Sequence, residues 1–344
     1  MVENLFKKRL YCNFKVVRIP RVSLNQKGHK DSSQPIAKLE KHKPMLENIT
    51  EDIIHVTGKN KGYFPFSNSV IILTPNGDAA LIDTGCGIET LKDLKNKFKI
   101  SRVINSHTHP DHSAGNWVFD DDDVSISVPR EGFETAGNLQ RLSERLAEPG
   151  PLSAFWREWV SETMDFRNMK ADNWFDADST IEIGNITLNP IHTPGHTADH
   201  YCFYESKKKI LFAFDYDLTS FGPWYGHRES DIGQFKDSIK RIMKLDIDIF
   251  VSGHKGIITD DIKARLNKYL SKFDDNEKKV LNLLSEGDKT IDEMTKLAPI
   301  YGAFPYAQPL LMYWEGNMIK KHLDELEKRG QVIKSDDGLY SLFR

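Results

Sequence analysis

The sequence predicts a mixed α/β fold built in layers. Short β-rich runs separated by Asn-Gly and Gly turns fill residues 48–84, and similar runs return between residues 179 and 254. Runs with helical periodicity lie between these two regions and after them. Several consecutive strands are joined by tight hairpin turns, whereas others alternate with helices. A mixed sheet in layers therefore agrees with the pattern better than a purely parallel sheet does.

Each element follows from its local pattern. The first strand runs are IIHVTG, SNSVIILTPNG and DAALIDTG, followed by the helical run ETLKDLKNKFK and the strand SRVINS. Residues 130–172 are helix-like, with a break at the Pro-Gly-Pro of residues 149–151. Strands then return in STIEIGNITLNPIHTPGH, YCFYESKKKILFAFD and IDIFVSGH.

Composition excludes several classes of protein. The chain has 344 residues, 28% charged residues and a formal net charge of −3. No apolar run approaches the roughly 20 residues of a membrane-spanning helix, and the amino end lacks a signal-peptide pattern. Three scattered cysteines, Cys12, Cys86 and Cys202, cannot form a disulfide framework or a CxxC zinc site. We expect a cytoplasmic protein with no membrane partner.

Three parts of the chain differ in character. Residues 1–45 form a basic extension with eleven Lys/Arg against three Asp/Glu, residues 46–262 form the main domain, and residues 263–344 form a smaller one. The extension could contact nucleic acid or an anionic surface, act as a transit peptide, or simply be solvated.

The carboxyl-terminal part has the element order of a winged helix. Two helical runs precede a third that stops at Gly330, and a hairpin with an Asp-Asp-Gly turn follows. Residues 275–344 hold ten Lys/Arg and twelve Asp/Glu, whereas nucleic-acid binders usually present a basic face. We therefore interpret this part as a module that packs against one side of the site or forms a dimer interface. A homodimer remains one of the expected partners.

Residues 104–116 read INSHTHPDHSAGN and crowd three histidines and an aspartate into six positions. On an extended segment His107 and His109 project to the same side. If a helix begins at Pro110, Asp111 and His112 point from its first turn toward the same place. Imidazole nitrogens and carboxylates are ligands of Zn²⁺ and iron ions. The spacing therefore predicts a metal site.

Four further candidates each close a strand-like run. They are Asp83 in AALIDTG, His196 in HTPGHT, Asp215 in ILFAFD and His254 in IFVSGH. Ligands at strand ends allow a rigid sheet to hold loops over one shared site.

The complete pattern resembles the motif set of the metallo-β-lactamase superfamily over roughly residues 48–262. The residues that carry it are His107-x-His109-x-Asp111-His112, Gly195-His196, Asp215 and Gly253-His254. The resemblance implies an αβ/βα sandwich, in which two facing sheets carry helices outside and a metal site along one edge.

The resemblance also implies a ligand set for two ions. The first ion would be held by His107, His109 and His196, the second by Asp111, His112 and His254, and Asp215 would bridge them. Asp83 would support the site without being a ligand. One departure is Phe214, which stands where family members commonly have Gly before the bridging aspartate. Asp217 is therefore an alternative for that role.

Such a site supports hydrolysis. Two divalent ions, with zinc expected and iron or manganese as alternatives, would activate a water as hydroxide, and Asp111 could orient it and move its proton. Relatives that reduce oxygen at a diiron centre usually carry Glu at the position of His109, so His109 favours hydrolysis. Secreted antibiotic-cleaving relatives normally lack the aspartate at the position of Asp215, so Asp215 argues against that branch. Cys86 is interpreted as a small turn residue, not as a nucleophile.

Two aromatic segments are expected near the site. In the loop of residues 216–228, Tyr225 and His227 are the polar groups expected to contact a substrate or stabilise an oxyanion, unless the loop is simply packed. In the helix-like segment of residues 130–172, Phe155, Trp156 and Trp159 could cap the site or belong to the core.

The preferred hypothesis is a metal-dependent hydrolase that cleaves an ester, thioester or lactone bond of a small molecule. The alternative is a metal-dependent endoribonuclease with RNA as partner. The winged-helix order behind the main domain resembles the β-lactamase-like protein 2 group, which includes such an enzyme. A third hypothesis, a DNA-binding regulator without catalytic activity, agrees poorly with a complete ligand set.

Overall fold

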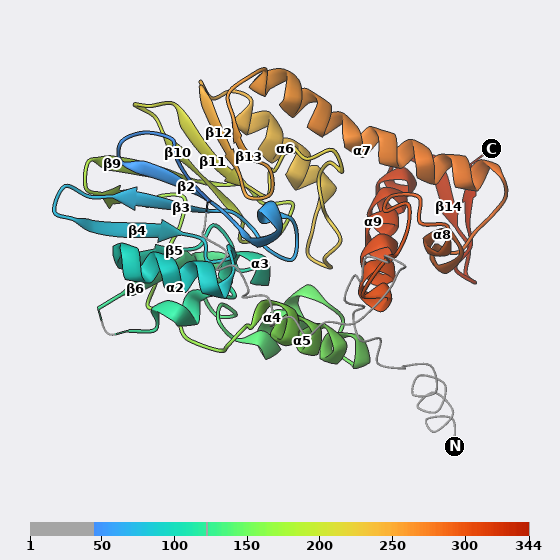
Figure 1. The fold of residues 1–344 in the computed structure, drawn as a ribbon. Coiled ribbons are helices and arrows are strands. Elements are labelled where there is room, and N and C mark those ends of the chain that lie inside the picture. Colours follow the sequence, from blue (N-terminus) through green and yellow to red (C-terminus); the bar gives the residue numbers. More distant parts are fainter. Residues whose placement is uncertain (1–44, 122, 344) are drawn as a thin grey trace, which may run out of the picture. The chain divides into compact units, whose positions relative to one another are not determined.

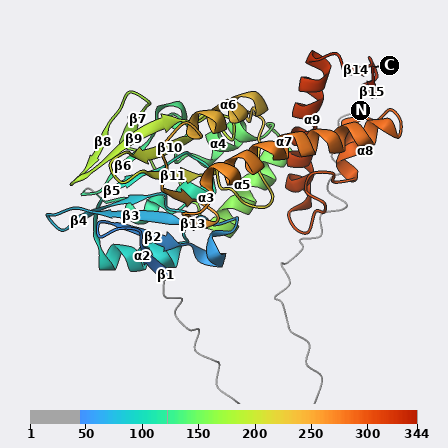
Figure 2. The same cartoon turned by 90° about the horizontal axis from the view of Figure 1, so that it is seen from above.

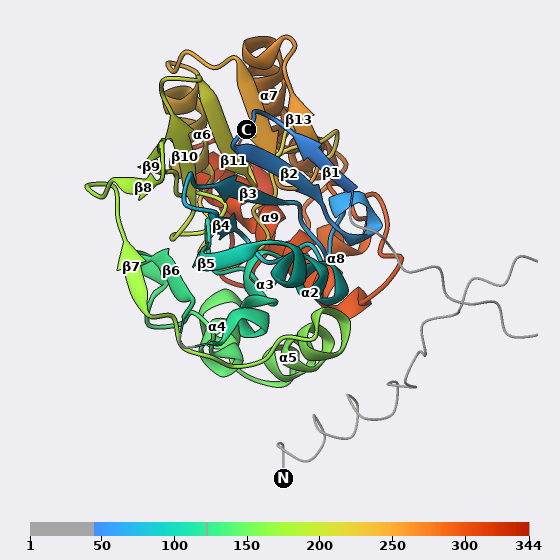
Figure 3. The same cartoon turned by 60° about the vertical axis from the view of Figure 1, so that its left-hand side comes forward.

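The computed structural model describes residues 45–121 and 123–343, so all but one residue of the predicted basic extension lie outside the described part. Two β-sheets lie face to face, and helices cover their outer faces (Figure 1). Figure 3 shows α6 and α7 on one side of the pair of sheets and α2 on the other. The predicted αβ/βα sandwich is confirmed.

The first sheet has the strand order of the chain itself. Its strands are β1 (Met45–Asn48), β2 (Ile53–Thr57), β3 (Ser69–Leu73), β4 (Asp78–Ile82), β5 (Lys99–Ile104), β6 (Ser125–Pro129) and β7 (Asn173–Phe175). The first four are antiparallel neighbours, as the tight turns predict, and β4 to β7 are parallel.

The second sheet comes from the other half of the chain, in the order β13-β12-β11-β10-β9-β8. Its strands are β8 (Ile181–Ile183), β9 (Ile186–His192), β10 (Tyr201–Glu205), β11 (Ile210–Phe214), β12 (Ile249–Ser252) and β13 (Gly256–Ile258). Only β11 and β12 pair in parallel, and helix α6 connects them.

Helices connect and cover the strands. They are α2 (Ile88–Lys97), α3 (Pro110–Ser113), α4 (Leu139–Leu146), α5 (Pro151–Met164), α6 (Ile232–Ile242), α7 (Ile262–Ser285), α8 (Ile291–Lys296) and α9 (Gln308–Lys328). Short 3-10 turns occupy Lys59–Gly62, Asn116–Phe119 and Arg130–Gly132. None of the helices in the described part is long and apolar enough to cross a membrane.

The core between the sheets consists of inward-facing side chains from both. Ile53, Ile82 and Ile104 of the first sheet belong to one buried cluster with Phe212 and Val251 of the second. Alternate residues face outward and pack under the helices, for example Leu81 against Leu91 of α2. This alternation is what the strand period of two requires.

The carboxyl-terminal elements continue the outer layer. Helix α7 begins on the second sheet beside α6 and runs outward to α8, α9 and a hairpin of β14 (Val332–Lys334) and β15 (Tyr340–Leu342) (Figure 2). One buried cluster joins Phe235 of α6, Phe273 of α7, Leu323 of α9 and Tyr340 of β15. The order of three helices and a hairpin agrees with the pattern read from the sequence, and its assignment as a winged helix stays a prediction.

Candidate metal centre

The predicted donor residues meet at one edge of the sandwich. Strand β5 leads into the segment with His107 and His109, β11 leads into Asp215, and β12 leads into His254. Helix α3 begins at Pro110, as expected, and presents Asp111 and His112 from its first turn. Both sheets therefore contribute donors to the same place.

The donors form two groups that share Asp215. The first donor group is His107, His109 and His196 with Asp215, and the second is Asp111, His112 and His254 with Asp215. Within each group the donor atoms lie within 4.8 Å of one another.

In the first donor group the side chains converge on one carboxylate oxygen. Asp215 Oδ2 lies 3.0 Å from His196 Nε2 and 3.8 Å from His107 Nε2. The Nδ1 atom of His109 lies 2.9 Å from His196 Nε2, so His109 faces the group with Nδ1.

In the second donor group the other oxygen of Asp215 is the common point. Asp215 Oδ1 lies 2.8 Å from His112 Nε2 and 3.3 Å from His254 Nε2. His254 Nε2 is also 3.6 Å from Asp111 Oδ2. One carboxylate thus faces both groups, which is the arrangement of a bridging ligand.

The electrostatics suit a divalent cation. Burial lowers the pKa of His107 and of His109 well below the ordinary value, so both imidazoles are neutral and offer a lone pair. Burial raises the pKa of Asp215, but His112 and the other imidazoles lower it well below its usual range. His107 Nε2 is buried without a hydrogen-bond partner among the described residues. A buried nitrogen without a hydrogen-bond partner beside an ionised carboxylate fits a site that binds a divalent cation.

The ring nitrogens that face away from the two groups have partners of their own. His196 Nδ1 lies 2.9 Å from the carbonyl oxygen of Trp224, and His254 Nδ1 lies 2.8 Å from that of Gly62. His112 Nδ1 lies 2.7 Å from Asp83 Oδ2. Such outer contacts fix the tautomer and the orientation of ligating imidazoles.

Asp83 supports more than one donor. It is fully buried, and its carboxylate accepts hydrogen bonds from the backbone N–H and the hydroxyl of Ser106, at 2.7 and 2.8 Å. Ser106 Oγ lies 3.0 Å from His107 Nδ1. Asp83 therefore contacts His112 directly and His107 through Ser106, and it belongs to neither donor group.

Phe214, which stands where family members commonly have Gly, has a positive φ angle. Its φ is +47°, a left-handed conformation that glycine adopts most readily. The bend places Asp215 in both donor groups. Asp217 belongs to neither group, and its Oδ1 accepts the backbone N–H of Thr219 at 3.1 Å. The alternative bridging role for Asp217 is therefore not favoured.

The two polar residues predicted from the 216–228 loop lie in different places. His227 is buried beside the first donor group, with Nδ1 2.9 Å from His109 Nε2. Tyr225 is not brought to the donors. Its ring is fully buried against Phe273, and its hydroxyl contacts His322 Nε2 at 2.8 Å and Asn276 Nδ2 at 3.1 Å. The expectation that Tyr225 contacts substrate is therefore corrected, because its hydroxyl joins the loop to α7 and α9.

One face of α9 holds this loop. Asn317 Nδ2 donates to the carbonyl oxygen of Gly226, and Lys321 Nζ donates to that of His227, both at 2.8 Å. The ring of Trp314 packs at 5.4 Å from that of Trp224. A side chain at Gly226 would lie within 2.8 Å of both tryptophans, so only glycine allows this approach.

A second support was missed by the sequence analysis and is centred on Arg145 of α4. Its guanidinium forms ion pairs with Asp199 at 2.8 Å and with Glu229 at 3.0 Å. It also donates to the hydroxyls of Thr108 and Thr197, both at 3.1 Å. Thr108 lies between His107 and His109, and Thr197 follows His196. Arg145 therefore ties together the segments that carry the first donor group.

Aromatic side chains from distant segments line the same side of the site. Phe64 stacks on Trp159 of α5 at 5.6 Å between ring centroids and meets Trp314 of α9 at 6.2 Å. Trp224 lies 5.6 Å from the ring of His196. Trp156 and Trp314 are 2% and 4% exposed and belong to one buried core cluster, whereas Phe64, Trp159 and Trp224 are half-buried at its edge and form an aromatic wall.

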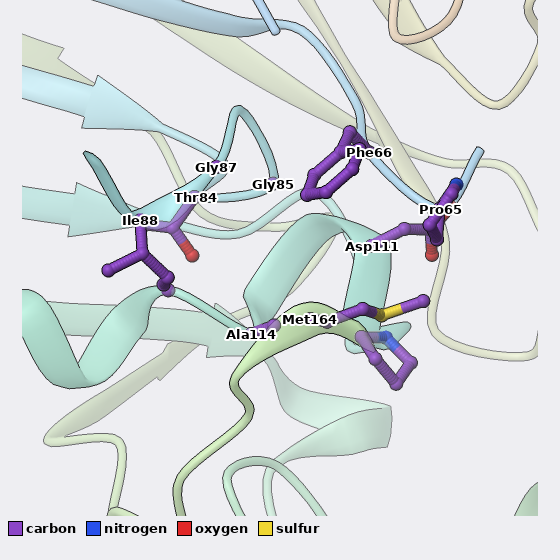
Figure 4. Close-up of a pocket in the computed structure, with 11 residues that line it drawn as sticks. Pro65, Phe66, Thr84, Gly85, Gly87, Ile88, Asp111, Ala114 and Met164 are labelled. Carbon is purple, nitrogen blue, oxygen red and sulfur yellow. The ribbon is translucent and has the colours of Figure 1, made fainter. Parts of the chain in front are cut away.

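A small cavity of about 10 Å³ lies on the other side of Asp111. Figure 4 shows Asp111 near Pro65 and Phe66, with Ile88 and Met164 around the same space. Among the residues that line it, Asp111 carries the only charge. Asp111 thus lines this cavity and also belongs to the second donor group.

A family model described as the metallo-beta-lactamase superfamily matches residues 62–254, the segment that contains both donor groups. The chain belongs to the metallo-beta-lactamase superfamily. It is a hydrolase of that superfamily.

Two fungal proteins illustrate the relationship. The chain is 26% identical over 250 residues to the lactamase-like protein aptB of Emericella nidulans, and the match covers 71% of this chain and 69% of the relative. It is 25% identical over 276 residues to an atrochrysone carboxyl ACP thioesterase of Passalora fulva, and the match covers 75% of this chain and 71% of the relative.

Two crystal structures share the fold. A metallo-beta-lactamase family protein of Thermus thermophilus superposes with a TM-score of 0.64 at 22% identity, covering 80% of this chain and 94% of that protein. A beta-lactamase domain protein of Burkholderia ambifaria superposes with a TM-score of 0.65 at 14% identity, covering 87% of this chain and 93% of that protein.

Proposed function

We propose that this hydrolase cleaves small-molecule acyl thioesters at a centre of two divalent metal ions, with zinc as the expected ion. The observation that carries the proposal is the pair of donor groups joined by one carboxylate, Asp215. His107, His109 and His196 would hold the first ion with Asp215, and Asp111, His112 and His254 would hold the second with it. The thioesterase name of the Passalora fulva relative supports a thioester as the scissile bond.

Divalent ions in such a pair lower the pKa of water toward neutrality and polarise a carbonyl oxygen. The chain's own residues would then handle protons and orientation. The carboxylate of Asp111, 7% exposed and 3.6 Å from His254, would accept a proton from the attacking water. It could return that proton to the departing thiolate, which is a general acid–base role.

The aromatic wall supports an apolar acyl group in the substrate. Phe64, Trp159 and Trp224 are half-buried, come from three separate segments and pack around the buried Trp314, whose ring lies 5.9 Å from that of His227. Aromatic side chains that line a site bind flat or bulky apolar groups better than short ones. We therefore expect bulky acyl thioesters to be better substrates than acetyl thioesters.

Nothing among the described contacts favours RNA as the substrate. The face of α9 with Asn317, Lys321 and His322 is engaged with the 216–228 loop. Nucleic-acid recognition by a helix needs a free basic face.

The test is a substrate panel with the full-length protein loaded with zinc. Benzoyl, octanoyl and acetyl thioesters, a lactone and single-stranded RNA are compared, with Asp215→Ala as the inactive control. We expect the benzoyl and octanoyl thioesters to have the highest kcat/KM. Zinc-dependent RNA cleavage without thioester turnover would contradict the proposal.

A further inference from the structure

His109 differs from the other donor histidines in the partner of its outer ring nitrogen. The outer nitrogens of His112, His196 and His254 face oxygen atoms, and that of His107 faces the hydroxyl of Ser106. The outer nitrogen of His109, Nε2, faces another imidazole nitrogen, Nδ1 of His227, at 2.9 Å.

The chemistry of imidazole assigns a direction to this contact. A neutral histidine that offers Nδ1 to a cation carries its proton on Nε2. His109 and His227 are only 3% and 5% exposed, so this N–H needs an acceptor within the protein. A neutral imidazole accepts through its unprotonated nitrogen, and Nδ1 of His227 is the nitrogen in place.

We propose that His227 is a positioning residue that accepts the Nε2 proton of His109 in a hydrogen bond and holds Nδ1 of His109 toward the first donor group. The inference rests on the proposed function, since it takes the first donor group to hold an ion. It also gives His227 a different role from the substrate contact expected from the sequence.

The carboxyl-terminal helix α9 keeps His227 in this position. Lys321 and Asn317 bind the carbonyl oxygens of His227 and Gly226, and the ring of His227 lies 5.9 Å from that of Trp314. Trp314, Asn317 and Lys321 are three and four residues apart and therefore share one face of the helix. Helix α9 thus extends the support of the metal centre beyond the segment matched by the family model.

The same contacts could also reflect packing alone, and two substitutions separate the roles. His227→Phe keeps an aromatic ring against Trp224 and Trp314 but removes the acceptor. His227→Asn loses the ring but can place Oδ1 near the former Nδ1. A packing role predicts that Phe is the better replacement, and an acceptor role predicts that Asn is.

The experiment measures zinc affinity of the full-length protein by competition with a chromophoric chelator, and Co²⁺ absorption spectra serve as a second readout. We expect His227→Phe to weaken one of the two zinc sites by about 10–100-fold and to leave the other unchanged. His227→Asn should retain most of the affinity. His55→Phe is the control, because His55 is a buried histidine whose ring nitrogens have no hydrogen-bond partner among the described residues.

Equal affinities in wild type and His227→Phe, or a larger loss in His227→Asn than in His227→Phe, would overturn the inference. If His227→Phe does not fold, Lys321→Met takes its place, with a smaller loss expected at the same zinc site. No loss in Lys321→Met would then overturn it. A wild-type protein that binds fewer than two zinc ions would instead contradict the proposed function.

Discussion

The two donor groups share Asp215 but depend on different parts of the chain. The second donor group is held from within the sandwich, because His112 contacts Asp83 at the end of β4 and His254 contacts the carbonyl oxygen of Gly62. The first donor group is held largely from outside it. His109 contacts His227 of a loop bound by α9, and Arg145 of α4 ties the segments around it.

This difference indicates which parts of the centre can change independently. The supports of the second donor group belong to the strands and turns of the sandwich itself. Apart from the contact of His107 with Asp83 through Ser106, the supports of the first donor group belong to helix α4, to the 216–228 loop and to the helix α9 that binds this loop. We therefore expect substitutions in α4 and α9 to act on the first ion and substitutions near β4 to act mainly on the second.

The largest effect is expected where the two groups meet. Asp215→Ala should remove the second ion and lower kcat by on the order of 10³-fold, because one carboxylate serves both groups. The measurement is zinc content together with thioester turnover, and circular dichroism reports on the fold. Asp217→Asn is the control. A larger loss in Asp217→Asn would show that the bridging role has been assigned to the wrong aspartate.

The next effect concerns the support of the first donor group by α4. Arg145→Met leaves the fully buried Asp199 and the carboxylate of Glu229 without their cation. We expect the free energy of unfolding to fall by about 3–5 kcal/mol and the first zinc site to weaken. Chemical denaturation and zinc titration measure the two effects.

Two variants sharpen this prediction. Arg157→Met on α5 removes an arginine whose hydrogen bonds go to serine hydroxyls, so it should have a much smaller effect. The double variant Arg145→Met/Asp199→Asn should regain part of the lost stability. Equal destabilisation by Arg145→Met and Arg157→Met would contradict the role given to Arg145.

A smaller effect is expected at Asp83. Asp83→Asn weakens the contact to His112 and should lower the affinity of the second zinc site by about 10–100-fold. The first site should lose less, because Asp83 reaches His107 only through Ser106. Zinc titration of this variant beside His227→Phe compares the two groups directly. Loss at the same single site in both variants would remove the distinction between them.

A further effect concerns acid and the contact of α9 with the 216–228 loop. Burial lowers the pKa of His322 to about 3, below the 6.5 of the unfolded chain. The folded state then binds fewer protons, so this contribution to stability is complete above pH 6.5 and is lost as pH falls toward 3. Each pH unit in this window costs up to about 1.4 kcal/mol for one proton.

His322→Gln should therefore reduce the slope of unfolding free energy against pH between pH 6.5 and 4.5. The comparison is made in the presence of a chelator, so that loss of zinc does not contribute to the slope. An unchanged slope would mean that His322 is already accessible to protons in the folded protein.

The donor residues were predictable because their positions depend on local geometry. His107 and His109 are two residues apart on an extended segment, and Asp111 and His112 follow in the first turn of α3. The layered α/β class followed from the strand pattern, and the αβ/βα sandwich followed from the resemblance to the family.

The supports were not predictable because they depend on contacts between distant segments. Arg145 lies more than 35 residues from Thr108 and 84 residues from Glu229. Tyr225 and His227 are two residues apart, yet one packs against Phe273 and the other against His109. One sequence signal for a support of the 216–228 loop lies in α9, because the spacing of Trp314, Asn317 and Lys321 places them on one face of the helix. The spacing alone does not indicate which segment this face contacts.

The most direct test of the two-group centre is the metal content of the full-length protein after expression with ample zinc. Elemental analysis should give about two ions per chain, because each donor group is complete when Asp215 is shared. A ratio of one ion or none would contradict the account.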